Sequence, residues 1–195
     1  MAYNVAILYG SVRQSRLGIR AVRWMEHLVR ERGCEPVVVD QQEYQLPLLE
    51  TPLHHYPEPS QAPDNVQRAA TALTAADGFV VVGGEYNHAI QPGLSNLIDY
   101  FYRAQYAYKP ALICSYSYGP FGGVRAATQL RTHLAEVGMV TMPTTIAVAS
   151  ITESLNTEGV PQRESMGTYA RAAVDEFEFY LRALATERAK GTPAV

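Results

Sequence analysis

The fold is decided by the stretch Val5-Ala6-Ile7-Leu8-Tyr9-Gly10-Ser11-Val12-Arg13-Gln14-Ser15-Arg16-Leu17-Gly18. A short apolar run stops at a Gly-Ser turn, and a polar loop leads from there into an amphipathic segment. A strand that feeds a helix in this way aims backbone N–H groups and the positive end of the helix dipole at one point. Serine hydroxyls and arginine guanidinium groups add donors there. The stretch therefore predicts a phosphate-binding site.

The bulk composition fits a soluble globular protein. The chain has 195 residues, of which 47% are hydrophobic and 18% charged, and we expect residues 1–195 to form a single domain. A net charge of -3 argues against a general nucleic-acid-binding surface, and no apolar run reaches the length of a membrane span. The N-terminus enters the first apolar run without a signal-peptide pattern, so we expect a cytoplasmic protein.

The cysteines and histidines give no metal-binding pattern. Cys34 and Cys114 lie outside any CxxC or Cys/His cluster, so we expect two reduced structural thiols and no metal centre. His54 and His55 are adjacent, but no carboxylate or cysteine spacing supports them as ligands.

Strand-like and helix-like segments alternate along the chain. Short apolar runs predict strands, and apolar residues at three- and four-residue spacing predict helices. The expected strands are 3–9, 36–40, 78–83, 111–116 and 139–148, the last interrupted by Pro143. The expected helices are 16–32, 64–76 (with Asp64 as N-cap), 94–105, 124–137 and 166–189. We expect the Pro-rich segment 41–63 and the polar segment 150–165 to be loops.

Five successive βα units predict an α/β fold. We expect a flavodoxin-like three-layer sandwich with a five-stranded parallel sheet in the order 2-1-3-4-5. Ligands of such sheets bind beyond the carboxyl ends of the strands, where the strand order switches between the first and third strands. The loops 10–18, 83–93 and 115–123 would border one cleft at that position.

The type of phosphate ligand follows from what the first loop contains. The chain has no GxxxxGK[ST] motif, and no GxGxxG follows the first strand, so nucleoside triphosphates and dinucleotides are disfavoured. Side-chain donors in Gly10-Ser11-Val12-Arg13 favour a terminal monophosphate instead. FMN combines a monophosphate with a broad planar ring, and it is the cofactor that we expect.

Three motifs together resemble the NADPH-dependent FMN reductase family, the small flavodoxin-like NAD(P)H:quinone or azo reductases. The motifs are Gly10-Ser11-x-Arg13 extended by Ser15-Arg16-Leu17-Gly18, Glu85-Tyr86-Asn87 followed by Pro92-Gly93 and Leu94-x-Asn96-x-Ile98-Asp99, and Gly122-Gly123-x-Arg125-Ala126. The chain departs from the family pattern at Gly84, where a proline is usual, at Ser95, where a lysine is common, and at Tyr100, where a tryptophan is frequent. We expect Gly84 to loosen the flavin loop.

The resemblance implies bound FMN and NAD(P)H as co-substrate. It implies hydride transfer from NAD(P)H through FMN to a quinone, azo compound, free flavin or similar acceptor by a ping-pong mechanism, with no catalytic side chain. It also implies a homodimer or homotetramer, with loop 46–56 and helix 94–105 as interface candidates. The implied cofactor-binding residues are Ser11, Arg13, Ser15, Arg16, Leu17 and Gly18 for the phosphate, Gly84, Glu85, Tyr86 and Asn87 for the flavin ring, and Ser117, Tyr118 and Gly119 for its other side.

Two other functions stay open on the sequence. One is a non-enzymatic FMN electron carrier of the flavodoxin type, and the other is a ligand-sensing or scaffold protein that has lost turnover. Flavodoxins are usually more acidic and use Ser/Thr-rich phosphate loops, so the arginines of this loop and the mild net charge count against the first.

Overall fold

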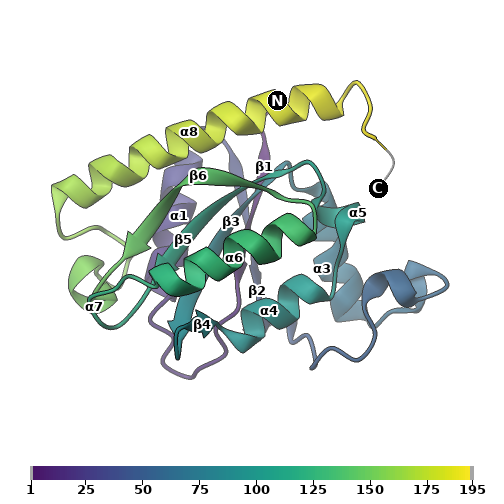
Figure 1. Ribbon diagram of the computed structural model, residues 1–195, viewed down its shortest axis with the longest axis horizontal. Coiled ribbons are helices and arrows are strands. Elements are labelled where there is room, and N and C mark those ends of the chain that lie inside the picture. Colours follow the sequence, from purple (N-terminus) through teal and green to yellow (C-terminus); the bar gives the residue numbers. More distant parts are fainter. Residues whose placement is uncertain (1, 194–195) are drawn as a thin grey trace.

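The computed structural model describes residues 2–193 and has three layers, with helices on both faces of a sheet (Figure 1). The parallel strands are β1 (Asn4–Tyr9), β2 (Glu35–Asp40), β3 (Gly78–Tyr86), β5 (Pro110–Tyr116) and β6 (Val140–Val148). Their order is β2-β1-β3-β5-β6, and the short strand β4 (Ala89–Ile90) pairs antiparallel with the end of β3. Counted without β4, this is the predicted order 2-1-3-4-5. The predicted fold class is therefore confirmed, with one additional strand.

The helices divide between the two faces of the sheet. The long helices are α1 (Ile19–Glu31), α3 (Asp64–Ala75), α4 (Pro92–Asp99), α6 (Val124–Glu136) and α8 (Glu164–Arg188). On β1, Val5 and Ile7 pack with the buried residues of α1 and α8, whereas Ala6 and Leu8 pack with those of α3, α4 and α6. Side chains alternate along a strand, so β1 supplies both cores. This explains its unbroken apolar sequence.

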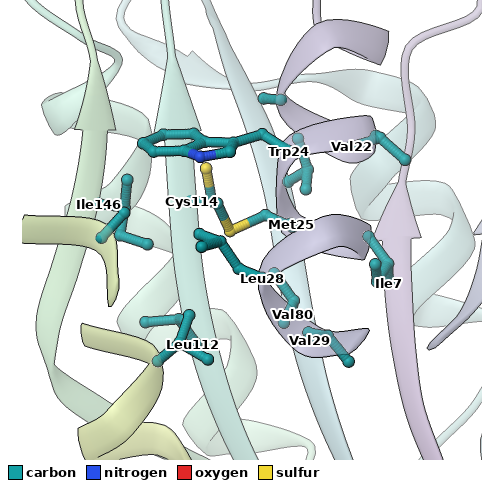
Figure 2. Close-up of a cluster of buried hydrophobic side chains, with 14 of the residues drawn as sticks. Ile7, Val22, Trp24, Met25, Leu28, Val29, Val80, Leu112, Cys114 and Ile146 are labelled. Carbon is teal, nitrogen blue, oxygen red and sulfur yellow. The ribbon is translucent and has the colours of Figure 1, made fainter. Parts of the chain in front are cut away.

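The core beneath α1 contains the only tryptophan of the chain. Figure 2 shows Trp24 and Met25 of α1 pointing toward Cys114 on β5, with Ile146 of β6 beside them. All four residues are buried, and Cys114 is fully enclosed. Burial raises the pKa of the Cys114 thiol to about 12, so the thiol stays protonated and packs as an apolar group.

Two expected helices have different bounds in the structure. Helix α1 begins at Ile19 rather than at residue 16, because residues up to Gly18 belong to the loop after β1. The expected helix 94–105 is two helices, α4 and α5 (Arg103–Tyr106). Between them Tyr100 and Phe101 are both buried, and Tyr102 is extended. Placing two successive aromatic rings in the core requires the chain to leave the helix, which the spacing pattern did not reveal.

The segment predicted as the loop 41–63 contains three short helices. They are α2 (Gln41–Tyr44), η1 (Leu53–His55) and η2 (Pro59–Gln61). Asp40 caps α2 through a hydrogen bond from the Gln42 backbone N–H (2.9 Å). The segment docks on α4 through Asn96, which accepts from the Leu49 N–H and donates to the Pro47 carbonyl, each at 2.8 Å. Side-chain caps and clamps of this kind explain why an aperiodic sequence is ordered.

Three smaller expectations also differ from the structure. Asp64 is the first residue of α3 and not its cap, because Pro63 precedes it with no side-chain hydrogen bond. The expected loop 150–165 includes the short helix α7 (Ile151–Ser154). The interruption at Pro143 is confirmed, since the pairing of β6 with β5 shifts register between Thr141 and Thr145. Among residues 2–193, no helix combines the length and apolar character that a membrane span requires.

Candidate functional site

The loops after β1, β3 and β5 meet at the carboxyl ends of these strands and surround a cavity of about 110 Å³. This is the switch in strand order where the topology predicts a ligand. The residues that line the cavity are Ser11, Arg13, Ser15, Arg16, Leu17, Gly84, Glu85, Tyr86, Tyr116, Ser117, Tyr118 and Ile151. The three predicted loops are therefore brought together.

Most of the predicted cofactor-binding residues line this cavity, with three exceptions. Gly18 is buried against the Tyr116 ring, Asn87 lies in the turn between β3 and β4 at φ 52°, and the Gly119 carbonyl accepts from the Ser117 hydroxyl and the Ser150 N–H, each at 2.8 Å. The sequence reading missed Tyr116 and Ile151. Tyr116 lies in the loop 115–123 that the sequence predicts at the cleft, and its position at the carboxyl end of a strand next to the switch point is a signal that could have identified it.

The loop after β1 presents one unpaired cation. Arg13 is exposed and makes no ion pair with any residue between 2 and 193. Its guanidinium group lies 3.9 Å from the centre of the Tyr86 ring, and the Tyr86 hydroxyl is 3.3 Å from the Ser11 hydroxyl. The first turn of α1 carries no acidic residue and no side-chain cap, so the positive end of its dipole is locally uncompensated. This corner of the cavity favours an anion.

Arg16 of the same loop is held by a buried carboxylate. Its Nη1 atom donates to both oxygens of Asp40, at 2.5 and 2.6 Å, and to the Ser11 carbonyl at 3.3 Å. The Asp40 side chain is 1% exposed and that of Arg16 is 16% exposed. Arg16 therefore joins the loop after β1 to the end of β2, and its charge is largely balanced before any ligand binds.

The predicted loop 83–93 is mainly a hairpin. Strand β3 continues to Tyr86, the chain turns at Asn87 and His88 with φ of 52° and 67°, and β4 returns beside β3. Asparagine tolerates this left-handed conformation better than most residues, because its side chain can hydrogen-bond locally. The motif that resembles a flavin loop is therefore an extension of the central strand.

Glu85 is fully engaged by helix α6. Arg125 donates from Nε to one oxygen of Glu85 at 2.7 Å and from its backbone N–H to the other at 3.2 Å, and its Nη2 also pairs with the carboxylate. Burial opposes ionisation of Glu85, but the hydrogen bonds from Arg125 lower the pKa of Glu85 below its usual value. The carboxylate thus fixes the hairpin to α6. A ligand can therefore form hydrogen bonds with the backbone of this segment but not with the Glu85 carboxylate.

Gly84 is braced rather than loose, contrary to the sequence expectation. Its N–H donates to the Gln91 side-chain carbonyl at 3.0 Å, and the Gln91 amide nitrogen donates to the Tyr116 hydroxyl at 2.9 Å. A Cβ atom on Gly84 would lie 2.8 Å from Cζ of Tyr116, and one on Gly18 would lie 2.3 Å from the same atom. Both glycines are therefore needed for the Tyr116 ring to sit where it does.

The two buried tyrosines near the cavity, Tyr9 and Tyr116, are neutral. Burial raises the pKa of Tyr116 and that of Tyr9, which is completely buried. The Tyr9 hydroxyl has no hydrogen-bond partner within the part of the chain that the structure describes. The Tyr9 and Tyr116 rings supply planar apolar surface and uncharged hydroxyls.

The loop after β5 is held by its own serines. Ser117 donates to the Gly119 carbonyl and accepts from the Gly122 N–H, each at 2.8 Å, and Ser115 donates to the Gly122 carbonyl at 2.7 Å. Tyr118 is 77% exposed at the edge of the cavity. The loop thus offers its backbone and an exposed aromatic ring to a ligand.

The two sides of the cavity match the two parts of FMN. The loop after β1 offers a cation, hydroxyls and N–H groups for a phosphate. The other walls offer Tyr86, Tyr116 and the backbone around Gly84, which suit a planar ring with polar edges. The cavity is smaller than the range of about 300–1,000 Å³ usual for ligand sites, and the stacked Arg13 and Tyr86 side chains occupy part of the space between the loops.

Comparison with known proteins gives consistent matches. The family described as NADPH-dependent FMN reductase matches residues 3–153. The chain is 30% identical over 187 residues to the NAD(P)H-dependent FMN reductase ntnL of Nectria sp, covering 89% of this chain and 90% of that protein. It is 40% identical over 72 residues to a quinone reductase of Escherichia coli (strain K12), covering 35% of this chain and 38% of that protein.

A solved structure shares the fold. The flavoenzyme NAD(P)H:(acceptor) oxidoreductase FerB from Paracoccus denitrificans superposes with a TM-score of 0.78 and 24% identity, covering 93% of this chain and 98% of that chain. At this identity the likeness supports the flavodoxin-like architecture.

Proposed function

The chain belongs to the NADPH-dependent FMN reductase family, and we propose from this that it is an FMN-dependent enzyme that oxidises NAD(P)H and reduces a small acceptor. The acceptor class that we propose is a quinone, an azo compound, a free flavin or a similar molecule. The observation that carries the proposal is a single cavity in which the unpaired cation of Arg13 faces a planar, backbone-rich wall around Gly84 and Tyr116.

We assign the predicted residues to two parts of the cofactor. Those assigned to the phosphate are Ser11, Arg13, Ser15, Arg16, Leu17 and Gly18, and those assigned to the ring are Gly84, Glu85, Tyr86, Asn87, Ser117, Tyr118 and Gly119. Of these, Gly18, Asn87 and Gly119 do not line the cavity, and we assign them to shaping the loops around the cofactor. Arg13 supplies the direct charge, whereas Arg16 shapes the loop through Asp40. The Glu85 carboxylate is paired with Arg125, so we assign only the backbone of Glu85 to contact with the flavin ring.

Bound FMN supplies hydride acceptance from NAD(P)H and electron donation to the acceptor. The chain contributes binding and orientation: Tyr116 and Tyr86 limit where a ring lies, and the hairpin fixes the polar edge beside it. We assign no acid–base residue, because alignment of the reactants accounts for most of the rate in a transfer of this kind. One open cavity implies that donor and acceptor bind in turn, which is a ping-pong scheme.

The proposal is tested with purified protein. Flavin absorption bands and steady-state oxidation of NADPH or NADH with a quinone are expected, with parallel double-reciprocal lines at several acceptor concentrations. Bound flavin without turnover by either nicotinamide would favour the non-enzymatic electron carrier. Absence of both flavin and turnover after loading with FMN would rule the proposal out.

We also propose that the protein is a homodimer that uses the surface of loop 46–56 and α4. Leu48 is 84% exposed, yet the backbone on both sides of it is clamped by Asn96. An ordered, exposed apolar side chain is a suitable anchor for an interface. Leu48→Glu is expected to yield monomers in light scattering, and an unchanged molar mass would contradict this surface.

The remaining proposals concern the chain as a whole. We propose that residues 1–195 are one FMN-binding domain, since each core cluster takes side chains from β1, β3, β5 and helices distant in sequence. The two cysteines are free and buried, which suits a cytoplasmic, reducing location. Limited proteolysis that leaves a stable half-chain fragment would contradict the single domain, and cell fractionation tests the location.

A further inference from the structure

We propose that Gln91 is a positioning residue of the flavin site. Its buried side-chain amide joins the backbone of Gly84 to the hydroxyl of Tyr116, so that two walls of the cavity are set relative to each other by one group. Gln91 does not line the cavity itself, and it acts through these two neighbours. The inference rests on the proposed function, because it concerns where the flavin ring is held.

The need for Gln91 follows from the strand pairing. Gly84 is the last residue of β3 in register with β5, where it lies opposite Tyr116, and Glu85 is the first residue in register with β4, opposite Ile90. Gln91 directly follows Ile90. The Gly84 N–H therefore lies where β3 changes partners, and a buried N–H without an acceptor is costly. The Gln91 side chain supplies that acceptor.

Gln91 is also fixed from its own backbone. It precedes Pro92, the first residue of α4, and its carbonyl accepts from the N–H groups of Leu94 and Ser95 at 3.0 and 3.1 Å. Its side chain is enclosed, with the residue 1% exposed. One residue thus connects the start of α4, the end of β3 and the end of β5, and its rotamer is determined from both sides.

The orientation of the amide follows from its partners. The Gly84 N–H is a donor, so the Gln91 atom that faces it is the carbonyl oxygen, and the amide nitrogen must face Tyr116. The Tyr116 hydroxyl accepts this bond, which leaves its own hydrogen for another acceptor. Tyr116 and Gly84 both line the cavity. Gln91 therefore determines how the Tyr116 hydroxyl and the Gly84 backbone are oriented toward a bound flavin ring.

Gly84, Gln91 and the Tyr116 ring are closely packed. A Cβ atom on Gly84 would lie 2.5 Å from the amide nitrogen of Gln91 and 2.8 Å from the Tyr116 ring. The ring is bounded on another side by Gly18, where a Cβ would approach within 2.3 Å. Gly84 and Gly18 thus leave no room for a side chain of their own, and we expect loss of the Gln91 hydrogen bonds to alter how Gly84 and Tyr116 are placed.

Two substitutions test the two hydrogen bonds. Gln91→Met keeps the length of the side chain and removes both bonds, so we expect FMN to bind at least tenfold more weakly and the midpoint potential of the bound FMN to shift. Gln91→Glu keeps an acceptor for the Gly84 N–H and can accept from the Tyr116 hydroxyl, so it reverses the second bond, but it adds a buried negative charge. We expect it to retain more of the FMN affinity and to make the midpoint potential more negative.

The matched control is Gln67→Met. The Gln67 amide also braces backbone, donating to the carbonyls of Ser60 and Ala62 at 3.0 and 2.7 Å, but it lies on α3 and lines no part of the site. FMN dissociation constants come from fluorescence titration and midpoint potentials from equilibration with redox dyes. The apo-protein melting temperature is measured for each variant, and Gln67→Met is expected to change only that temperature.

The outcomes are distinguishable. If the wild-type protein binds no FMN, both the proposed function and this inference are wrong. If the wild-type protein binds FMN and oxidises NAD(P)H, but both Gln91 variants keep its dissociation constant within twofold and its potential, the inference is wrong and the function stands. If Gln91→Met lowers only the melting temperature, as the control does, Gln91 is structural and the inference is overturned. If Gln91→Met does not fold, the midpoint potential of FMN bound to Gln91→Glu is the test. A more negative potential supports the inference, and an unchanged potential overturns it.

Discussion

The loop after β1 and the hairpin after β3 form opposite sides of the same cavity by different means. The loop, residues 10–18, is exposed at residues 12–15 and offers charge through Arg13. The hairpin, residues 84–91, is a strand extension in which the buried Gln91 side chain holds the Gly84 N–H and helix α6 holds the Glu85 carboxylate. A mobile phosphate tail needs attraction, whereas a rigid ring needs a fixed edge. In the function that we propose, the contrast separates residues that give affinity from residues that give placement.

Arg16 is the residue of the loop after β1 that a buried group holds in place, as in the hairpin. It is paired with the buried Asp40, and Asp40 also caps α2. The loop therefore contains one cation that is free for a ligand and one that is already neutralised by the fold. The four predictions below test this division, beginning with the largest effect.

Asp40→Ala removes the carboxylate that balances Arg16 and caps α2. We expect a loss of about 3–5 kcal/mol in the free energy of unfolding, since the guanidinium group is left mostly buried without a partner. Urea denaturation of the apo protein measures the loss. Asp175→Ala is the control, because Asp175 pairs with Arg32 but is 59% exposed, and we expect it to cost less than about 1 kcal/mol. Equal losses in the two variants would show that the loop after β1 has no buried anchor.

Arg13→Ala removes the unpaired cation of the same loop. We expect FMN binding to weaken by about 2 kcal/mol or more, as for the loss of a charge-assisted phosphate contact, with little change in apo-protein stability because Arg13 is exposed. Fluorescence titration at two salt concentrations measures the effect, which should shrink at high salt. Arg182→Ala, on the exposed surface of α8, is the control. Unchanged FMN affinity would place the phosphate elsewhere.

Glu85→Gln tests the hairpin through pH. The pKa of Glu85 is lowered in the folded protein, so its pairing with Arg125 stabilises the fold fully above the ordinary glutamate pKa and is lost as the pH falls through the lowered value. We expect the variant to be less stable by about 1 kcal/mol at pH 7 and the difference to vanish in acid. Urea unfolding of both proteins from pH 7 downward measures this. A difference that persists in strong acid would contradict the ion pair.

Tyr86→Phe tests the contact between the hairpin and the loop after β1. It removes the hydroxyl that lies 3.3 Å from Ser11 and keeps the ring beneath Arg13. The hydrogen bond is long, so we expect FMN affinity to change by less than about 0.5 kcal/mol. Tyr86→Leu also removes the cation–π contact and should change the affinity by about 0.5–1 kcal/mol. Equal titration curves for the two variants would show that the ring contact with Arg13 has no effect on binding.

The sequence predicted the features that depend on local pattern. Alternating βα segments predicted the sheet order, and three small-residue loops after strands predicted the cavity, because chain direction and strand order bring carboxyl ends together. Arg13 could be assigned from its place in the turn after an apolar strand. These inferences need no knowledge of which residues contact one another at long range.

The sequence did not reveal the groups whose roles depend on partners distant in the chain. Asp40 looks like the end of a strand until Arg16, 24 residues earlier, is seen beside it. Gln91 has a role only because β4 turns back on β3, and the hairpin register is not encoded in a hydrophobic period. Gly84 appeared to loosen the loop, since a glycine without tertiary partners is flexible. In the structure its N–H is bonded and its missing side chain makes room for Tyr116.

The Asn96 clamp has a consequence for how the segment 41–63 opens. The N–H of Leu49 donates to Asn96, and that of Leu53 donates to the Tyr100 carbonyl at 2.8 Å, so two amides of an irregular segment are bonded to α4 and the residue that follows it. Deuterium replaces such protons only when the bonds open. We therefore expect both amides to be protected from exchange, and equal exchange rates would show that residues 49–53 lift away from α4 as one unit.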